Sequence, residues 1–159
     1  MAKKLSGKYY LKNTSNGSYS DVTTLYDGVN ILSIEGIDAL GKSINTYVEQ
    51  WMSGGVDFLI TSNNGVIVRE MVDIKVVFVV GQRYATTVGI DPQTVYDNFV
   101  SYMTNTDIWI KDTYVGKQVH CVCIDGVEPQ SIKLKRGNDS YLLGSISLHC
   151  LEKPTAYQS

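Results

Sequence analysis

The stretch Val72-Asp73-Ile74-Lys75-Val76-Val77-Phe78-Val79-Val80 decides the fold. Hydrophobic residues occupy every second position, and the charged residues Asp73 and Lys75 lie between the first of them. Because successive side chains of a β-strand point to opposite faces, this alternation predicts a strand with one buried face. Val77 and Val79 make the far end apolar on both faces, so we expect another element to cover that end.

The residues before this stretch predict a hairpin. Residues 56–60 form an apolar run, residues 62–65 (Ser-Asn-Asn-Gly) are a turn signal, and a return strand begins at Val66 and extends to Val80. A separate strand is predicted for residues 29–34. Residues 44–52 fit either a helix, by their spacing, or an irregular strand, by their β-branched and aromatic content.

One helix is predicted after the central strand, over residues 91–105. Asp91 can accept hydrogen bonds from the free N–H groups at its start, and Pro92 suits the first helical position. An apolar stripe follows at helical spacing, formed by Val95, Phe99, Tyr102 and Met103.

The last third of the sequence predicts two further hairpins. Residues 107–112 and 117–124 flank the turn 113–116, and residues 131–136 and 141–151 flank the turn 137–139. With 11 Tyr, 14 Gly and 3 Pro, the composition also favours strands and tight turns. We therefore predict a mainly β (α+β) fold: an antiparallel β-sandwich or barrel of hairpins with one packed amphipathic helix.

The length of 159 residues suits one domain. We expect a flexible basic N-terminal arm (residues 1–28), a single β-rich domain (29–153) and a C-terminal tail (154–159). The net charge of −2 gives no basic field for nucleic acid, so we expect no specific nucleic-acid binding. No apolar run has the roughly 20 residues that cross a bilayer, so we expect no membrane partner either.

Aromatic residues outside the predicted core are candidates for subunit contacts, since Tyr and Trp bury area and keep a polar group. The candidates are Tyr9, Tyr10, Tyr19, Tyr26, Trp51 and Tyr114. The alternative is that these rings pack on their own domain.

Two clusters contain metal-ligating residue types: His120, Cys121 and Cys123, and His149 with Cys150. In a strand, Cys121 and Cys123 point to one face and His120 to the other, whereas structural zinc sites place their cysteines on a turn. We therefore predict buried, inert cysteines and no metal site. No arrangement of nucleophile and base stands out, so we assign no catalytic residue and no cofactor.

The sharpest motif is Gly36-Ile-Asp-Ala-Leu-Gly41-Lys42-Ser43, which matches the phosphate-binding loop G-x-x-x-x-G-K-[ST]. In such loops the backbone N–H groups and the Lys hold phosphates, and the Ser hydroxyl binds Mg²⁺. That motif belongs to a parallel α/β sheet, which the successive hairpins do not predict. A small nucleotide kinase or NTPase using Gly36, Gly41, Lys42 and Ser43 is therefore the alternative function, and a glycine-rich turn is the simpler interpretation.

The order of elements resembles the tail-tube fold of phage tails, which distal tail proteins and the tube proteins of type VI secretion also use. The residues that carry the resemblance are the strand 66–80, the helix 91–105, the strand 107–112 and the turn 114–117; distal tail proteins similarly have an Arg-Glu-led strand, here Arg69-Glu70.

The resemblance implies a structural, non-enzymatic protein of the virion tail, made in the cytoplasm of the bacterial host. It also implies a homo-oligomeric ring, of six copies in that family, with other tail proteins as partners. Tube protein, distal tail protein and tail-completion protein all remain open. A β-rich adaptor that binds some other protein is a further alternative.

Overall fold

The computed structural model of the protein describes residues 8–39, 46–50, 57–61, 67, 69–124, 132–136 and 139–156. The chain divides into two compact units. The larger comprises residues 1–38 and 73–159, and the smaller comprises residues 39–72. Each unit is described by itself.

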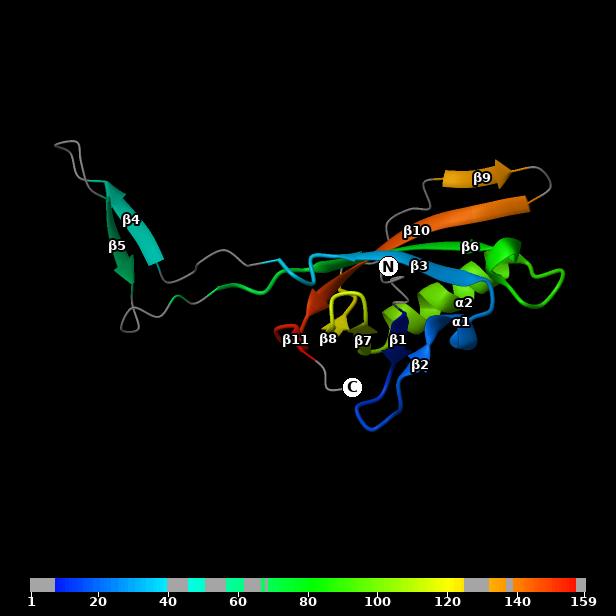
Figure 1. The fold of residues 1–159 in the computed structure, drawn as a ribbon, viewed down its shortest axis with the longest axis horizontal. Coiled ribbons are helices and arrows are strands. Elements are labelled where there is room, and N and C mark those ends of the chain that lie inside the picture. The colour runs from blue at the N-terminus through cyan, green and yellow to red at the C-terminus, as the bar shows by residue number, and fades with distance from the viewer. Residues whose placement is uncertain are drawn as a thin grey trace, which may run out of the picture. The chain divides into compact units, whose positions relative to one another are not determined.

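The larger unit is built on one antiparallel sheet of nine strands with the central order β2-β1-β7-β8-β10-β6-β3, while β11 pairs with β8 and β9 with β10 (Figure 1). The strands are β1 (Tyr9–Lys12), β2 (Ser20–Asp21), β3 (Val29–Glu35), β6 (Ile74–Gly81), β7 (Ile108–Asp112), β8 (Lys117–Val122), β9 (Ile132–Arg136), β10 (Asp139–Cys150) and β11 (Thr155–Ala156). The helices are α1 (Val22–Leu25), the 3-10 turn η1 (Gln82–Tyr84) and α2 (Pro92–Asn105).

Strand β10 joins the two parts of this sheet. Its residues Tyr141 to Leu148 pair with β6, and its last two residues, His149 and Cys150, pair with Val122 and Cys121 of β8. Because one strand of 12 residues takes part in both ladders, the sheet is continuous from β2 to β3.

The core confirms the alternation of the central strand. Ile74, Val76, Phe78 and Val80 are all at most 1% exposed, and Val79 on the other face is also buried. The remaining core comes from every part of the larger unit, and its largest fully buried members include Leu11, Phe99, Met103, Ile108, Ile110, Ile146 and Leu148. Each such side chain contributes roughly 1.5–3 kcal/mol by leaving water.

Helix α2 packs on β10, β6 and β3 (Figure 1). The predicted helix is confirmed, with Pro92 in its first turn. Its buried side chains are Tyr96, Phe99 and Met103, so the core-facing stripe includes Tyr96, and Tyr102 lies at its margin, only partly buried. Asp91 makes no side-chain bond to a helical N–H group; its Oδ2 accepts a hydrogen bond from the Thr94 hydroxyl at 2.7 Å instead.

The mainly β class with one packed helix is confirmed, and so are three local predictions. Residues 29–34 lie in β3, β7 pairs with β8 across the turn 113–116, and β9 pairs with β10. None of the described helices combines the length and the apolar character needed to cross a bilayer.

The predicted arm differs from the structure over its described residues. Tyr9–Lys12 form β1, which pairs with β7, and Leu11 is fully buried. Val22, which opens α1, is also buried. Because polar residues surround these few apolar positions, the sequence pattern did not predict β1, which belongs to the sheet, or α1, whose Val22 belongs to the core. Thr155–Ala156 likewise pair with β8 rather than forming only a tail.

The smaller unit contains the antiparallel pair β4 (Thr46–Gln50) and β5 (Asp57–Thr61). For the stretch 44–52, the strand alternative is therefore correct over residues 46–50, and its other residues lie outside the described ones. The predicted hairpin of residues 56–60 with residues 66–80 differs from the structure over its described part, because β5 pairs with β4 and β6 begins only at Ile74. Residue 56, the predicted turn at residues 62–65, and residues 66 and 68 lie outside the described residues. The hydrophobic pattern of the sequence predicted that β5 and β6 are strands. It did not indicate the strand with which β5 or β6 would pair.

Candidate assembly surfaces

Two of the aromatic candidates meet where β1 runs beside the turn after β7. The rings of Tyr9 and Tyr114 lie with their centroids 5.2 Å apart, and the Thr113 N–H donates to the Lys8 carbonyl at 3.1 Å. Burial, with a further contribution from the charge of Asp112, raises the pKa of Tyr9 to about 12. Tyr9 is thus held on its own domain, while Tyr114 keeps 46% of its surface exposed.

Asp112 fixes the shape of this turn. The residue is 3% exposed, and its carboxylate accepts hydrogen bonds from the backbone N–H groups of Tyr114 at 2.9 Å and Val115 at 3.4 Å. Burial raises the pKa of Asp112, although these two hydrogen bonds act in the opposite direction. The buried carboxylate therefore presents Tyr114 and Val115 to solvent as a small apolar tip.

A second group of aromatic and basic residues lies on β1, β7 and β8. The Nζ atoms of Lys12 and Lys111 lie 4.7 and 4.9 Å from the centroid of the Tyr19 ring. The Nζ atom of Lys12 also lies 5.6 Å from the centroid of the Trp109 ring. Trp109 is in turn stacked on His120, with 4.0 Å between the ring centroids. Tyr19 is therefore engaged by lysines of its own domain through cation–π contacts.

The edges of the sheet are the third feature. Among the described strands, β3 pairs only with β6 at one end of the sheet, and β2 pairs only with β1 at the other. The pairing of β3 with β6 shifts register between Ile31 and Ser33, and Leu32 at this bulge is 48% exposed. A free edge offers N–H and C=O groups with which another strand can pair.

The other aromatic candidates have different positions. Tyr10 is a half-buried residue of β1, opposite Asp21 and Lys111. Tyr26 packs edge to face against Phe99 and Tyr102. Trp51 lies outside the described residues. The alternative that these rings pack on their own domain thus accounts for Tyr9, Tyr19 and Tyr26, while Tyr114 is the most exposed of the described set.

The glycine-rich motif begins in a turn. Gly36 follows β3 with φ of 92°, and a Cβ there would meet the Asp73 carbonyl oxygen at 2.7 Å. Gly41, Lys42 and Ser43 lie outside the described residues. A phosphate-binding loop leads into a helix whose N-terminus holds the phosphate, whereas the next described element here is the strand β4. The glycine-rich turn is therefore the interpretation that the geometry favours.

The cysteines and histidines are held in separate contacts. Cys121 and Cys150 are buried opposite each other, and burial raises the pKa of both thiols, which keeps them protonated and unreactive. His120 Nε2 lies 3.2 Å from Asp107, and His149 Nδ1 lies 2.9 Å from Asp73. Among the described residues, no three His, Cys, Asp or Glu side chains group as metal ligands would.

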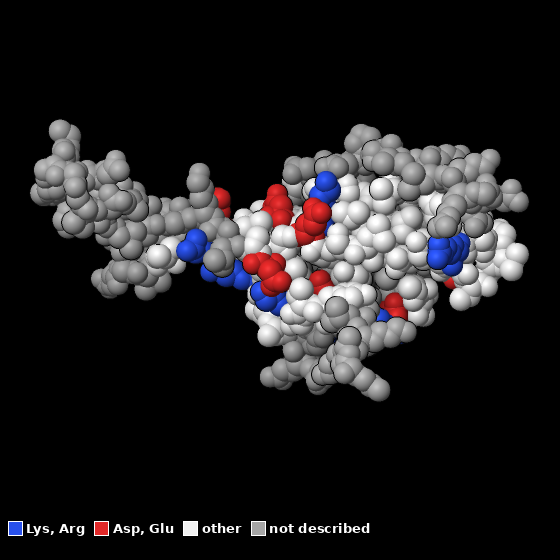
Figure 2. Space-filling model, turned by 45° about the horizontal axis from the view of Figure 1, so that its top comes forward, with Lys and Arg blue, Asp and Glu red and all other residues white. Residues whose placement is uncertain are grey.

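The charges of the described surface are mixed in sign. Figure 2 shows basic and acidic side chains interspersed, with broad uncharged areas between them. Lys8 pairs with Asp21 at 3.3 Å, and Lys117 pairs with Asp38. The described part of this face therefore shows no broad basic patch of the kind that binds a nucleic-acid backbone.

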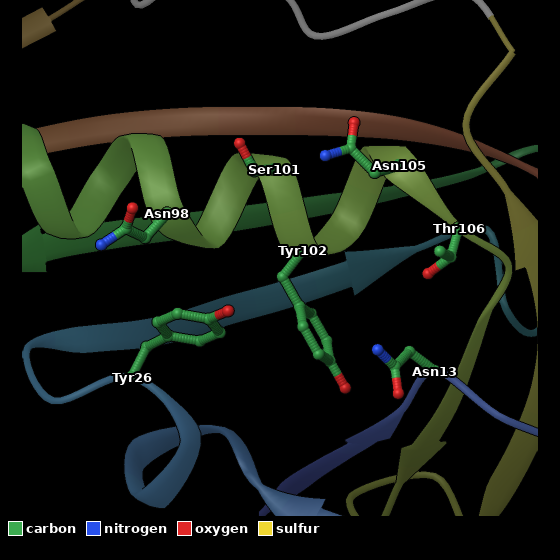
Figure 3. A pocket seen from close by; sticks show the side chains of 7 residues that line it. All are labelled: Asn13, Tyr26, Asn98, Ser101, Tyr102, Asn105 and Thr106. Atoms are coloured by element: carbon green, nitrogen blue, oxygen red, sulfur yellow. The ribbon is translucent and has the colours of Figure 1, made fainter.

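Sequence reasoning missed a polar cavity beside helix α2. Its volume is about 470 Å³, and its walls include Tyr26, Tyr102, Asn98 and Asn105 (Figure 3). The only available signal was the spacing of Asn98, Ser101, Tyr102 and Asn105, which share one helical face.

No model of a known protein family matches the sequence, and no curated protein matches it. Among solved structures, a chain of the phage p2 baseplate in its activated, Sr-containing conformation superposes with a TM-score of 0.57 and 13% identity, covering 93% of this chain and 45% of that one. SPP1 Dit (gp 19.1), described as a paradigm of the hub adsorption apparatus in phages that infect Gram-positive bacteria, superposes with a TM-score of 0.51 and 10% identity, covering 94% of this chain and 52% of that one.

The chain thus spans about half the length of each of these proteins. The expected resemblance to distal tail proteins is confirmed at the level of structure. Over most of its length, this chain has the fold of a phage baseplate chain and of the SPP1 Dit distal tail protein.

Proposed function

We propose that the protein is a structural subunit of a bacteriophage tail, located in the virion at or near the distal end of the tail tube, and that it acts by assembly rather than catalysis. The observation that carries this proposal is the shared fold with two phage proteins over 93% and 94% of this chain. The mixed surface charge and the glycine-rich turn at Gly36 agree with a role that needs no nucleotide or nucleic acid.

The proposed assembly is a closed ring of identical subunits, six by the family resemblance, that also contacts other tail proteins. A ring needs a head-to-tail contact between two different surfaces of the subunit. The free edge of β3 supplies one such surface, since a neighbouring strand can extend the sheet there. The apolar tip at Tyr114 and Val115 is a candidate for the other.

The mass of the purified protein in solution, with electron microscopy of the same sample, tests this proposal. We expect ring-shaped particles several times heavier than the 17.6 kDa chain, with a share that rises with concentration. A protein that stays monomeric at high concentration, alone and with tail extract of its phage, would contradict the ring.

A matched pair of variants tests the proposed edge. Leu32→Lys places a charge at the bulge of β3, where it would oppose strand addition. Val88→Lys adds the same charge at a residue that is 93% exposed in the loop before α2. We expect Leu32→Lys to weaken assembly at least tenfold and Val88→Lys to leave it unchanged. Equal effects would remove β3 from the interface.

A further inference from the structure

The cavity beside α2 lies within the larger unit and is built from three segments. Tyr26 directly follows α1, Asn13 directly follows β1, and the helix contributes Asn98, Ser101, Tyr102 and Asn105. In Figure 3 the two tyrosine rings project into the space below the helix, and Asn13 lies on the same side of it.

The described residues that line this cavity carry no charge. Its described lining residues are asparagine, serine, threonine and tyrosine, and none of them is Lys, Arg, His, Asp or Glu. A phenol is neutral over the physiological range at its ordinary pKa near 10, and burial raises the pKa of Tyr26 and Tyr102 further. A phosphate, a carboxylate or a cation would find no opposite charge here, and the ligand that fits is uncharged.

The polar groups of the helix are available to a ligand. Within the described part of the chain, the side chains of Asn98, Ser101 and Asn105 make no hydrogen bond to the protein. An asparagine amide offers two donors and an acceptor, and a serine hydroxyl offers both roles. The hydroxyl groups of a ligand also donate and accept hydrogen bonds. A molecule with several hydroxyls can therefore pair with the donors and the acceptors of these side chains at the same time.

The two aromatic rings supply the apolar part of the site. Tyr26 and Tyr102 meet edge to face, with centroids 5.6 Å apart and planes at 67°. Two rings at this angle form a corner that can cover the apolar C–H face of a pyranose, whose weakly positive hydrogens match the negative ring face. A flat aromatic ligand would match only one of the two rings.

We propose that this cavity binds a neutral saccharide, with Tyr26 and Tyr102 packing on the sugar ring and Asn98, Ser101 and Asn105 bonding to its hydroxyls. The volume of about 470 Å³ is within the range of small-molecule sites, roughly 300–1,000 Å³. The site needs residues of one subunit only, so it is independent of whether the protein assembles into a ring.

Amide chemical-shift titration of the full-length protein tests the proposal. The probes are glucose, galactose, N-acetylglucosamine and maltose, with glucose 6-phosphate and sialic acid as charged counterparts. We expect saturable shifts at Asn98, Tyr102 and Asn105 with at least one neutral probe, and weaker binding of the charged ones. Absence of saturable binding by every neutral probe, or preferred binding of a charged one, would overturn the proposal.

Three variants locate the binding. Asn98→Ala removes an exposed amide of the cavity, and we expect about tenfold weaker binding, the usual consequence of one lost polar contact. Tyr102→Phe keeps the ring that packs near the core and should keep most of the affinity. Asn16→Ala removes an exposed amide outside the cavity and should change nothing. Equal affinity in Asn98→Ala and Asn16→Ala would place the sugar elsewhere and overturn the assignment.

Discussion

Gly36 lies against the backbone of Asp73: a Cβ placed on Gly36 would be 2.7 Å from the Asp73 carbonyl oxygen. The φ of this glycine is 92°, which other residues adopt only with strain. The contact connects the end of β3 to the residue that precedes β6, next to the ladder in which Glu35 pairs with Lys75. The first glycine of the phosphate-loop motif thus has a structural role that is independent of any nucleotide.

Replacing Gly36 by alanine should therefore destabilise the fold. Gly116→Ala is the matched control, because Gly116 also has a positive φ of 72° but has open space where its Cβ would lie. We expect Gly116→Ala to cost about 1 kcal/mol from backbone strain alone and Gly36→Ala to cost clearly more, because a steric clash is added. Urea unfolding of both variants measures the difference, and equal losses would contradict the close contact.

The phosphate-loop alternative has its own test in Lys42. A nucleotide that binds the folded state raises the melting temperature in proportion to the logarithm of its concentration. We expect Mg²⁺-ATP and Mg²⁺-GTP to leave the melting temperature of the wild type and of Lys42→Ala unchanged. A rise in the wild type that Lys42→Ala abolishes would restore the nucleotide-binding alternative.

The carboxylate of Asp27 makes stability depend on acid. It accepts backbone hydrogen bonds from Thr86 and Thr87, both at 2.8 Å, and these bonds lower its pKa from 3.8. A lowered pKa means that its contribution to stability is present above pH 3.8 and is lost as the pH falls through the lower folded-state value.

We therefore expect wild type and Asp27→Asn to differ in free energy of unfolding by a constant amount from neutral pH down to about pH 4, and the difference to shrink below that pH. Chemical unfolding at a series of pH values measures it. A difference that stays the same at pH 2 would show that the charge of Asp27 does not contribute.

The partly buried phenol of Tyr9 acts at the opposite end of the pH scale. Its pKa is raised from 10.0 to about 12, because burial and the nearby Asp112 disfavour the tyrosinate. Its contribution to stability is thus complete below pH 10 and is lost as the pH rises through about 12. The ultraviolet absorbance of tyrosinate, as the difference between wild type and Tyr9→Phe, should titrate near pH 12. A difference spectrum that titrates near pH 10 would contradict the burial.

The sequence predicted the local elements better than their partners. The alternation of Ile74 to Val80, the Asp91-Pro92 helix start and the hairpin at residues 113–116 all lie within a few neighbouring residues, so pattern alone locates them. The partner of β5 depends on long-range packing that no local pattern encodes, and it was predicted wrongly. Strand β1 was missed because one buried residue, Leu11, among polar neighbours is too short a signal for periodicity.

The candidate surfaces were predictable in part. Abundant tyrosine outside the apolar runs pointed to Tyr9 and Tyr114, but only the fold shows that the first is held in place and the second exposed. The cavity beside α2 could not be predicted, because Tyr26 and Asn13 join the helical residues only after β1 and α1 have docked.

The shared strand β10 also has a mechanical consequence. Its eight residues paired with β6 and its last two paired with β8 lie along one strand, so tension along β10 loads all of these backbone hydrogen bonds together, in shear. Backbone hydrogen bonds that are loaded in shear must break at the same time. When two strands are instead peeled apart from one end, the hydrogen bonds between them break one after another. A protein pulled along β10 would therefore gain resistance to extension from this single continuous strand.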